Sequence, residues 1–305
     1  MTSQTISANI DQGSLLTFKE SFYKLAQQTN SKLGGTNAVI YRDPKGKTFQ
    51  TGRMGRIELI EVAGRNPDKE YSDYALDNRQ YSKRRFTITL TLDAKNDINE
   101  LLADPTSDLV TQLVAAKERM IDRVILQAAT GPVLTGRPDV APTSTSAAAD
   151  GVITIDASGG FTYEKIQEVT QNFINNEVDE MDSQIIITGK EFTDLMGEDQ
   201  FINNDYINGR PVETGIKQAG LYRLTRFAGS VTGGAQVTNP YLPEATTTRK
   251  CVVLAPRSIE VAMELGRLEV EKNNSKVNSM DITIDLWLNA MRLEGPKVQV
   301  ITTTM

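Results

Sequence analysis

The sequence predicts an α+β protein, and three observations support this fold class. Residues 104–131 carry apolar side chains at helical spacing. Residues 85–92 alternate polar and apolar side chains, which is typical of a strand with one covered face. After Gly151, short apolar runs alternate with amphipathic segments, which indicates strands and helices in turn. With 39% hydrophobic and 24% charged residues in 305 positions, the chain can bury a substantial core.

The first 36 residues are expected to form an arm. Residues 1–13 are polar and without periodicity, whereas Ser14 is a suitable N-cap for a short amphipathic helix. The apolar face of this helix would consist of Leu15, Phe18, Phe22, Leu25 and Ala26. Two interpretations stay open: the helix docks elsewhere as part of an arm, or it packs on its own domain.

Residues 37–95 are predicted to form a long two-stranded excursion with a polar tip. Residues 85–92 supply one regular strand, and Ile57, Leu59 and Val62 indicate a less regular partner strand. The residues between them contain turn formers and charges, with little to bury. Because an isolated ribbon is only marginally stable in water, we expect a neighbouring subunit to support it.

The segment 104–131 is predicted to form a single helix, roughly 40 Å long at about 1.5 Å per residue. Pro105 has the fixed backbone angle of a first helical turn, and Asp104 precedes it. Gly131, which is followed by a proline, ends the helix. A rod of this length is expected to be the spine of the structure.

The remainder of the chain is predicted to alternate strands and short helices. Thr162 and Thr188 each stand before a helical pattern, and Cys251 lies in an apolar strand-like run where we expect a small buried hydrophobe. The last three apolar segments are interpreted as strands, or as strands and a helix: 259–270, 280–293 and 297–302.

Composition argues against catalysis. The chain has no histidine, which removes the usual general base and the commonest zinc ligand, and its single cysteine cannot form an internal disulfide. The segment Gly46-Lys47-Thr48 lacks the leading glycine of a phosphate-binding loop, and the acidic cluster 177–182 lacks calcium-loop spacing. We therefore expect no enzyme, no cofactor and no metal site. No apolar run approaches the ~18 residues of a membrane span.

Charge is distributed unevenly along the chain, although the total is only −6. Residues 42–95 carry 12 basic and 8 acidic residues (+4), whereas 96–249 carry 11 and 22 (−11). Such asymmetry indicates nucleic-acid binding or complementary surfaces that meet between copies. Since no aromatic residues are interleaved with the densest basic run, we favour an inter-subunit contact over nucleic acid or solvated charge. The candidate contact residues are Lys83, Arg84, Arg85, Arg53 and Arg56.

The order of these segments resembles the major capsid proteins of tailed double-stranded DNA phages, in particular the short-tailed group. The likeness rests on the block 101–108, which contains Asp104 and Pro105 and leads into a helix with Arg119-x-x-Asp122. Two further stretches are similar to that group: residues 27–33 to its arm motif, and 281–300, with Ala290-x-Arg292-Leu293, to the end of its peripheral domain. The likeness covers nearly the whole chain, and no single motif is decisive alone.

The resemblance implies the tailed-phage capsid fold with five segments. They are an N-terminal arm (1–36), an extended β-hairpin loop (37–95), a first peripheral part (96–158) with the spine helix 104–131, an axial α/β domain (159–249) and a second peripheral part (250–305). It also implies a structural protein that assembles as pentamers and hexamers into an icosahedral shell around the phage DNA. Encapsulins share this fold, so a nanocompartment shell protein is the alternative.

The implied partners are further copies of the chain, a portal and possible decoration proteins. A separate scaffolding protein is expected, because no long coiled coil precedes residue 37, unless the chain is already a processed form. The DNA would be enclosed without sequence-specific binding, no membrane would be involved, and the protein would belong to the virion after assembly in the host cytoplasm. Reversing Lys83, Arg84 and Arg85 to Glu is expected to impair assembly and leave subunit folding intact.

Overall fold

The computed structural model describes most of the chain, in segments. These are residues 28–34, 37–42, 45–59, 61, 74–93, 106–136, 141–198, 218–219, 221–228, 242, 248–272 and 279–304. The predicted arm helix, Asp104, Pro105 and the tip of the predicted excursion, with Val62, lie outside them. The chain divides into two compact units, each made from separated stretches of sequence. Unit 1 contains 1–30, 86–119 and 265–286, and unit 2 contains 31–85, 120–264 and 287–305.

The described residues form three helices and fourteen strands. The helices are α2 (Thr106–Thr130), α3 (Tyr163–Asn175) and α4 (Gly189–Met196). The strands are β1 (Ala38–Arg42), β2 (Thr48–Met54), β3 (Leu76–Ser82), β4 (Arg84–Asp93), β5 (Val133–Thr135), β6 (Thr143–Thr145), β7 (Ile153–Ala157), β8 (Gln184–Ile187), β9 (Gln218–Ala219), β10 (Tyr222–Arg226), β11 (Thr248–Leu254), β12 (Ile259–Lys272), β13 (Ser279–Arg292) and β14 (Val298–Thr304). Three sheets contain these strands.

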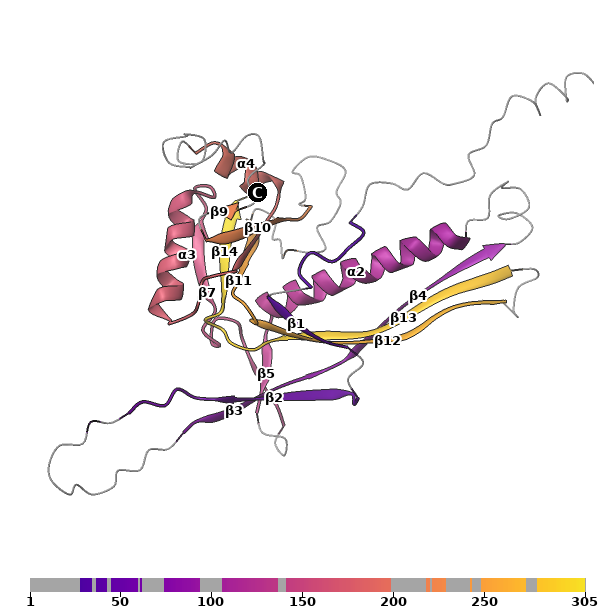
Figure 1. Ribbon diagram of the computed structural model, residues 1–305, viewed down its shortest axis with the longest axis horizontal. Helices are drawn as coiled ribbons and strands as arrows, with labels where there is room; N and C mark the ends of the chain where they lie inside the picture. The colour runs from indigo at the N-terminus through magenta and orange to yellow at the C-terminus, as the bar shows by residue number, and fades with distance from the viewer. Residues whose placement is uncertain are drawn as a thin grey trace, which may run out of the picture. The chain divides into compact units, whose positions relative to one another are not determined.

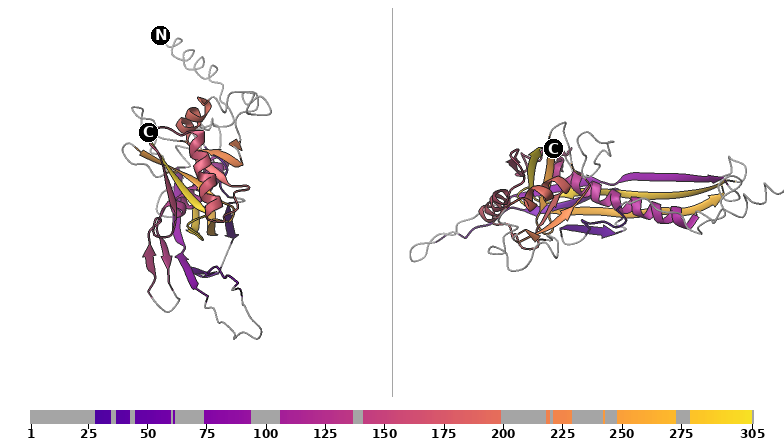
Figure 2. Two further views of the ribbon diagram at one scale, coloured as in Figure 1. Left: turned by 90° about the vertical axis from the view of Figure 1, so that its left-hand side faces the viewer. Right: turned by 90° about the horizontal axis from the view of Figure 1, so that it is seen from above.

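Unit 1 consists of the first half of α2 and the neighbouring stretches of β4, β12 and β13 (Figure 2). Leu113 from the helix and Ile282 and Ile284 from β13 form its buried core, and Leu90 and Leu109 pack against them. The apolar stripe predicted for the long helix therefore does face a sheet. The helix begins at Thr106 and ends at Thr130, close to the predicted limits.

Unit 2 contains a six-stranded sheet in the order β7-β14-β11-β8-β10-β9 (Figure 1). Its central strands are apolar on both faces: the side chains of 185–187 and of 252–254 are completely buried. Helix α3 contacts β7 and contributes Ile166, Val169 and Phe173 to the same core. This mixture of strands and helices confirms the alternating pattern predicted after Gly151.

Local signals account for the helix starts in unit 2. Thr162 is the N-cap of α3, and Thr188 forms a capping box with Glu191 at the start of α4. The closing segments are all strands, so the helical alternative for 280–293 is wrong. The run from Asp281 to Leu286 alternates polar and apolar residues, and this period of two favours a strand.

A third sheet, in the order β2-β3-β5-β6, contains the hairpin. Strands β2 and β3 pair in antiparallel register from Thr48↔Ser82 to Met54↔Leu76. The partner strands predicted for this excursion are wrong. Residues 57–59 follow β2 without forming a strand, and β4 is a neighbour of β13 in another sheet. The true second strand, β3, lies in the stretch that was expected to be a polar connection.

Candidate subunit-contact site at the hairpin

The outer half of the hairpin exposes large apolar side chains. Met54 and Leu76, which are cross-strand partners, are 65% and 61% exposed, and Leu59 is fully exposed. Ile57 and Tyr74 are also more than half exposed. Among the described residues, β3 pairs with β5 only at positions 79 and 80, so the outer residues of the two strands pair only with each other. Apolar side chains clustered in this way are typical of an interaction surface.

The base of the hairpin, by contrast, is fixed to β12 by two glutamates, of which Glu260 is buried and Glu264 is partly exposed. Glu260 accepts hydrogen bonds from the Thr51 hydroxyl (2.8 Å) and the Tyr81 hydroxyl (3.0 Å). Burial, together with the nearby charge of Glu260, raises the pKa of Tyr81, so the phenol stays a donor. Lys83 forms an ion pair with Glu264 and lies 5.4 Å from the centre of the Phe49 ring.

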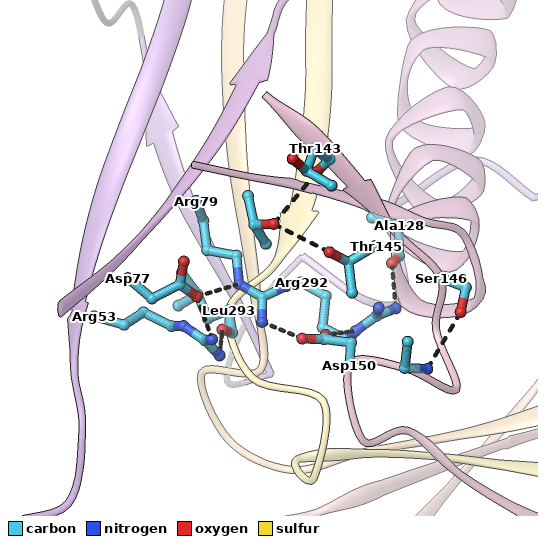
Figure 3. A network of polar contacts seen from close by, with 12 residues as sticks. Arg53, Asp77, Arg79, Ala128, Thr143, Thr145, Ser146, Asp150, Arg292 and Leu293 are labelled. Atoms are coloured by element: carbon cyan, nitrogen blue, oxygen red, sulfur yellow. Dashed lines mark hydrogen bonds and ion pairs between the residues drawn. The ribbon is translucent and has the colours of Figure 1, made fainter. Parts of the chain in front are cut away.

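Asp150 provides a second anchor for the hairpin (Figure 3). One of its carboxylate oxygens accepts a hydrogen bond from Arg79 of β3, and the other accepts one from Arg292 Nε at the end of β13 (2.8 Å). Arg79 and Arg292 are completely buried, and the Asp150 side chain is 5% exposed. Buried charges of this kind are tolerated only when they are paired, so the three residues form one structural unit.

Arg292 also completes the end of the long helix. Its Nη1 donates to the carbonyl oxygens of Ala128 (3.2 Å), Ala129 (2.8 Å) and Gly131 (3.1 Å). The last turn of α2 has no basic residue of its own, and Arg292 supplies the positive charge that a helix C-terminus favours. Burial lowers the pKa of Arg292, while Asp150 acts in the opposite direction and favours the charged form.

The five predicted contact residues are in different environments. Lys83 is buried and paired within the chain, whereas Arg84 and Arg85 are exposed. Arg84 is 3.4 Å from the Asn289 side-chain oxygen, and Arg85 lies over the Trp287 ring at 5.9 Å. Lys83 has the same parity along the chain as the inward-facing Tyr81, a signal that could have separated it from Arg84 but not from Arg85.

The two other predicted contacts, Arg53 and Arg56, lie on the hairpin itself. Arg53 pairs with Asp77 across the strands (2.5 Å) and donates to the Leu293 carbonyl (3.1 Å). Arg56 is two-thirds exposed and forms ion pairs with Glu58 (3.1 Å) and Glu177 (2.8 Å). Exposed pairs of this kind contribute little to stability, so Arg56 can exchange partners at low cost.

The Arg119-x-x-Asp122 motif holds the segment that leads out of the arm. Arg119 Nη1 donates to the Gln28 carbonyl oxygen (3.0 Å). The buried Asp122 carboxylate accepts hydrogen bonds from the Ser31 hydroxyl (2.6 Å), the Lys32 amide (3.0 Å) and the Leu33 amide (3.1 Å). Sequence reasoning marked both motif residues, but it did not reveal that they contact residues 28–33.

The described part of the chain contains no cluster of metal ligands, no membrane-spanning helix and no exposed cysteine. No group of three or more His, Cys, Asp or Glu side chains is placed there to hold a metal ion. None of the described helices is long and apolar enough to cross a membrane. Cys251 is completely buried, which confirms its predicted role, and burial raises the pKa of its thiol well above the usual range.

Comparisons with known proteins agree with this structure. Residues 10–304 match the family described as phage capsid protein. A comparison with curated proteins gives no significant match. The structure is similar to the capsid of Ralstonia phage GP4, with a TM-score of 0.67, 9% identity, and coverage of 95% of each chain.

Two cyanophage capsids show the same fold. The capsid of cyanophage P-SCSP1u gives a TM-score of 0.65 at 11% identity, covering 96% of this chain and 94% of that one. The capsid of cyanophage Pam1 gives a TM-score of 0.65 at 12% identity, covering 100% of this chain and 99% of that one. The family match favours the phage capsid over the encapsulin-type alternative. The chain therefore belongs to the phage capsid protein family and is a structural shell protein of the virion.

Proposed function

We propose that this protein assembles as pentamers and hexamers into an icosahedral shell that encloses the phage double-stranded DNA, and that it does so without catalysis. The observation that carries the proposal is the exposed apolar outer half of the β2–β3 hairpin. A two-stranded ribbon with large apolar side chains in water is unfavourable unless a partner covers them. A second copy of the chain is the partner that a shell supplies.

The segment assignments follow from the same proposal. The hairpin, within residues 37–95, extends onto the adjacent subunit; residues 159–249 form the axial domain, and 96–158 with 250–305 form the peripheral domain. The excess of acidic residues in 96–249 limits adhesion to the enclosed DNA, which is bound without sequence preference. Assembly takes place in the host cytoplasm with a separate scaffolding protein, and the further partners are a portal and any decoration proteins.

Sedimentation of the purified protein, with negative-stain imaging of the fast fraction, tests the proposal. Closed shells, or rings of five and six subunits, are the expected result, and DNA in particles isolated from infected cells would distinguish a virus shell from a cargo compartment. A chain that stays monomeric at all salt concentrations, even with its scaffolding protein present, would contradict it.

A paired substitution connects the proposal to the hairpin. Changing Met54 and Leu76 together to Ser removes two exposed apolar side chains and should prevent shell formation while the subunit stays folded. Met181→Ser is the matched control, because Met181 is equally exposed at 63% but lies in the acidic connection before β8. If the Met54/Leu76 variant assembles as efficiently as the control, the hairpin is not the adhesive surface.

A further inference from the structure

The contacts at the base of the hairpin contribute most of its buried restraints. The outer strand residues form strand pairs only with each other. The side-chain contacts described between this half and other segments are the hydrogen bond from Arg53 to the Leu293 carbonyl oxygen and the exposed ion pair of Arg56 with Glu177. Tyr74 lies five residues beyond Arg79, a span of roughly 17 Å at about 3.3 Å per residue. A rotation of about 10° at Arg79 would therefore displace Tyr74 by roughly 3 Å, enough to lose complementarity with a partner.

Asp150 is held in place by its own backbone surroundings. Its amide donates to the Ser146 carbonyl oxygen (3.0 Å), and the next residue, Gly151, has φ of 88°, which glycine adopts without strain. Gly295 approaches so closely that an added Cβ would lie 1.9 Å from the Asp150 carbonyl oxygen. These contacts make Asp150 a fixed point and not a mobile surface carboxylate.

The second oxygen of Asp150 is connected to the end of the long helix. Arg292 binds that oxygen and three carbonyl groups at the end of α2 at the same time. The path from the helix end to the hairpin thus runs through Arg292, Asp150 and Arg79, and all of it lies within unit 2. Arg79 and Arg292 are completely buried and the Asp150 side chain is only 5% exposed, so water has little access to this pairing in the folded subunit.

We infer that Arg79 and Asp150 are positioning residues that set the direction of the hairpin and thereby the geometry of the assembled shell. The inference rests on the proposed function and adds a specific role to it. The apolar outer half supplies adhesion, while the Arg79–Asp150 pair determines where that adhesive surface meets the next copy. Loss of the pair should leave adhesion intact and make the particles irregular.

Arg79→Gln is the decisive variant, because it removes the link to the hairpin and leaves the Asp150–Arg292 pair in place. We expect at least tenfold faster amide hydrogen exchange in β3, unchanged exchange in β8, and shells with a broad distribution of diameters or open edges. Arg79→Lys should restore uniform shells in part, because it keeps the charge. Asp156→Asn is the matched control, since Asp156 is exposed and the hydrogen bonds described for its side chain are with Ser158 alone.

The possible outcomes separate the two proposals. Wild-type exchange in β3 together with uniform diameters for Arg79→Gln would overturn the inference even if wild-type shells form. A wild-type protein that never forms closed shells would contradict the proposed function, while the exchange comparison would still test the restraint on the hairpin. Faster amide exchange in β3 and irregular shells for Asp156→Asn as well would also count against a specific role for Arg79 and Asp150.

Discussion

The six-stranded sheet and the β2–β3 hairpin belong to the same unit, but they are stabilised in different ways. In the sheet, side chains such as Ile186 and Val253 are completely buried, and apolar packing dominates. In the hairpin, the apolar side chains of Met54 and Leu76 are exposed, and buried polar groups hold the base. One region thus buries its apolar side chains within the subunit, whereas the other leaves large apolar side chains exposed.

The largest effect is expected in the sheet region, and it tests whether the apolar core there is packed within the subunit. Phe173→Ala removes a fully buried ring that packs near Tyr222, with centroids 6.3 Å apart, and should lower the free energy of unfolding by about 3–5 kcal/mol. Ile174→Ala, one position along α3 and 58% exposed, is the matched control. Denaturant unfolding measures the free energy of unfolding of both variants. An equal loss of stability in the two would show that α3 is not part of a packed core.

An intermediate effect is expected where polar contacts replace apolar packing. Asp122→Ala leaves the Lys32 and Leu33 amides and the Ser31 hydroxyl without their acceptor, which should cost about 1–3 kcal/mol. Trypsin should then cleave after Lys32 faster, because the segment is no longer held. Asp122→Asn keeps an acceptor oxygen, so its rate of cleavage should lie between those of the wild type and Asp122→Ala. Unchanged cleavage in the alanine variant would contradict the role of Asp122.

Acid should weaken the sheet region through Glu191. Burial alone would raise the pKa of Glu191, but hydrogen bonds from Thr188, its own backbone and Thr303, with the charge of Arg249, lower it overall. Because the folded pKa lies below the unfolded value, this stabilisation is present above pH 4.5 and is lost as the pH falls through the folded pKa. The stability difference between wild type and Glu191→Gln should therefore shrink below pH 4.5 in unfolding experiments. A difference independent of pH would show that this charge is not involved.

The smallest effect on the subunit is expected at the exposed basic residues beside the hairpin. Reversing Arg84 and Arg85 to Glu should change the unfolding free energy by no more than about 0.5 kcal/mol. The same variant should assemble less well, most clearly at low salt where surface charges are least screened. Lys83 should be left unchanged, since reversing this buried partner of Glu264 would test folding as well as assembly. Assembly that is insensitive to both the reversal and salt would exclude Arg84 and Arg85 as contacts.

Sequence reasoning succeeded where one periodicity dominated a segment. The long helix, the Thr162 and Thr188 helix starts and the alternating β4 all follow from local signals. It failed at β3, because the inward-facing positions of that strand are occupied by Arg79 and Tyr81 and not by aliphatic residues. Its polar sequence was therefore interpreted as a connection.

The polar anchors of the candidate site could not be predicted for a different reason. Arg79 and Asp150 are 71 positions apart along the chain, and Asp150 and Arg292 are 142 apart. Only the tertiary fold brings their charges together, and no local spacing encodes that contact. Arg292 and Asp122 were each marked by a motif of the resemblance, but the contacts that they make were not.

The connectivity of the two regions also determines the order in which they form. Strand β14 pairs with β7 across 146 positions, as in Ile301↔Ile155, whereas Met54 and Leu76 of the hairpin are 22 positions apart. Closing the longer loop costs more entropy and delays the sheet, so the hairpin forms first. By the proposed function, we expect a newly made chain to expose the apolar side chains of the hairpin before the rest of unit 2 has folded around its base. The interval between these two events is when nascent subunits are most prone to misassembly, and slower synthesis or chaperone binding during it should raise the yield of competent subunits.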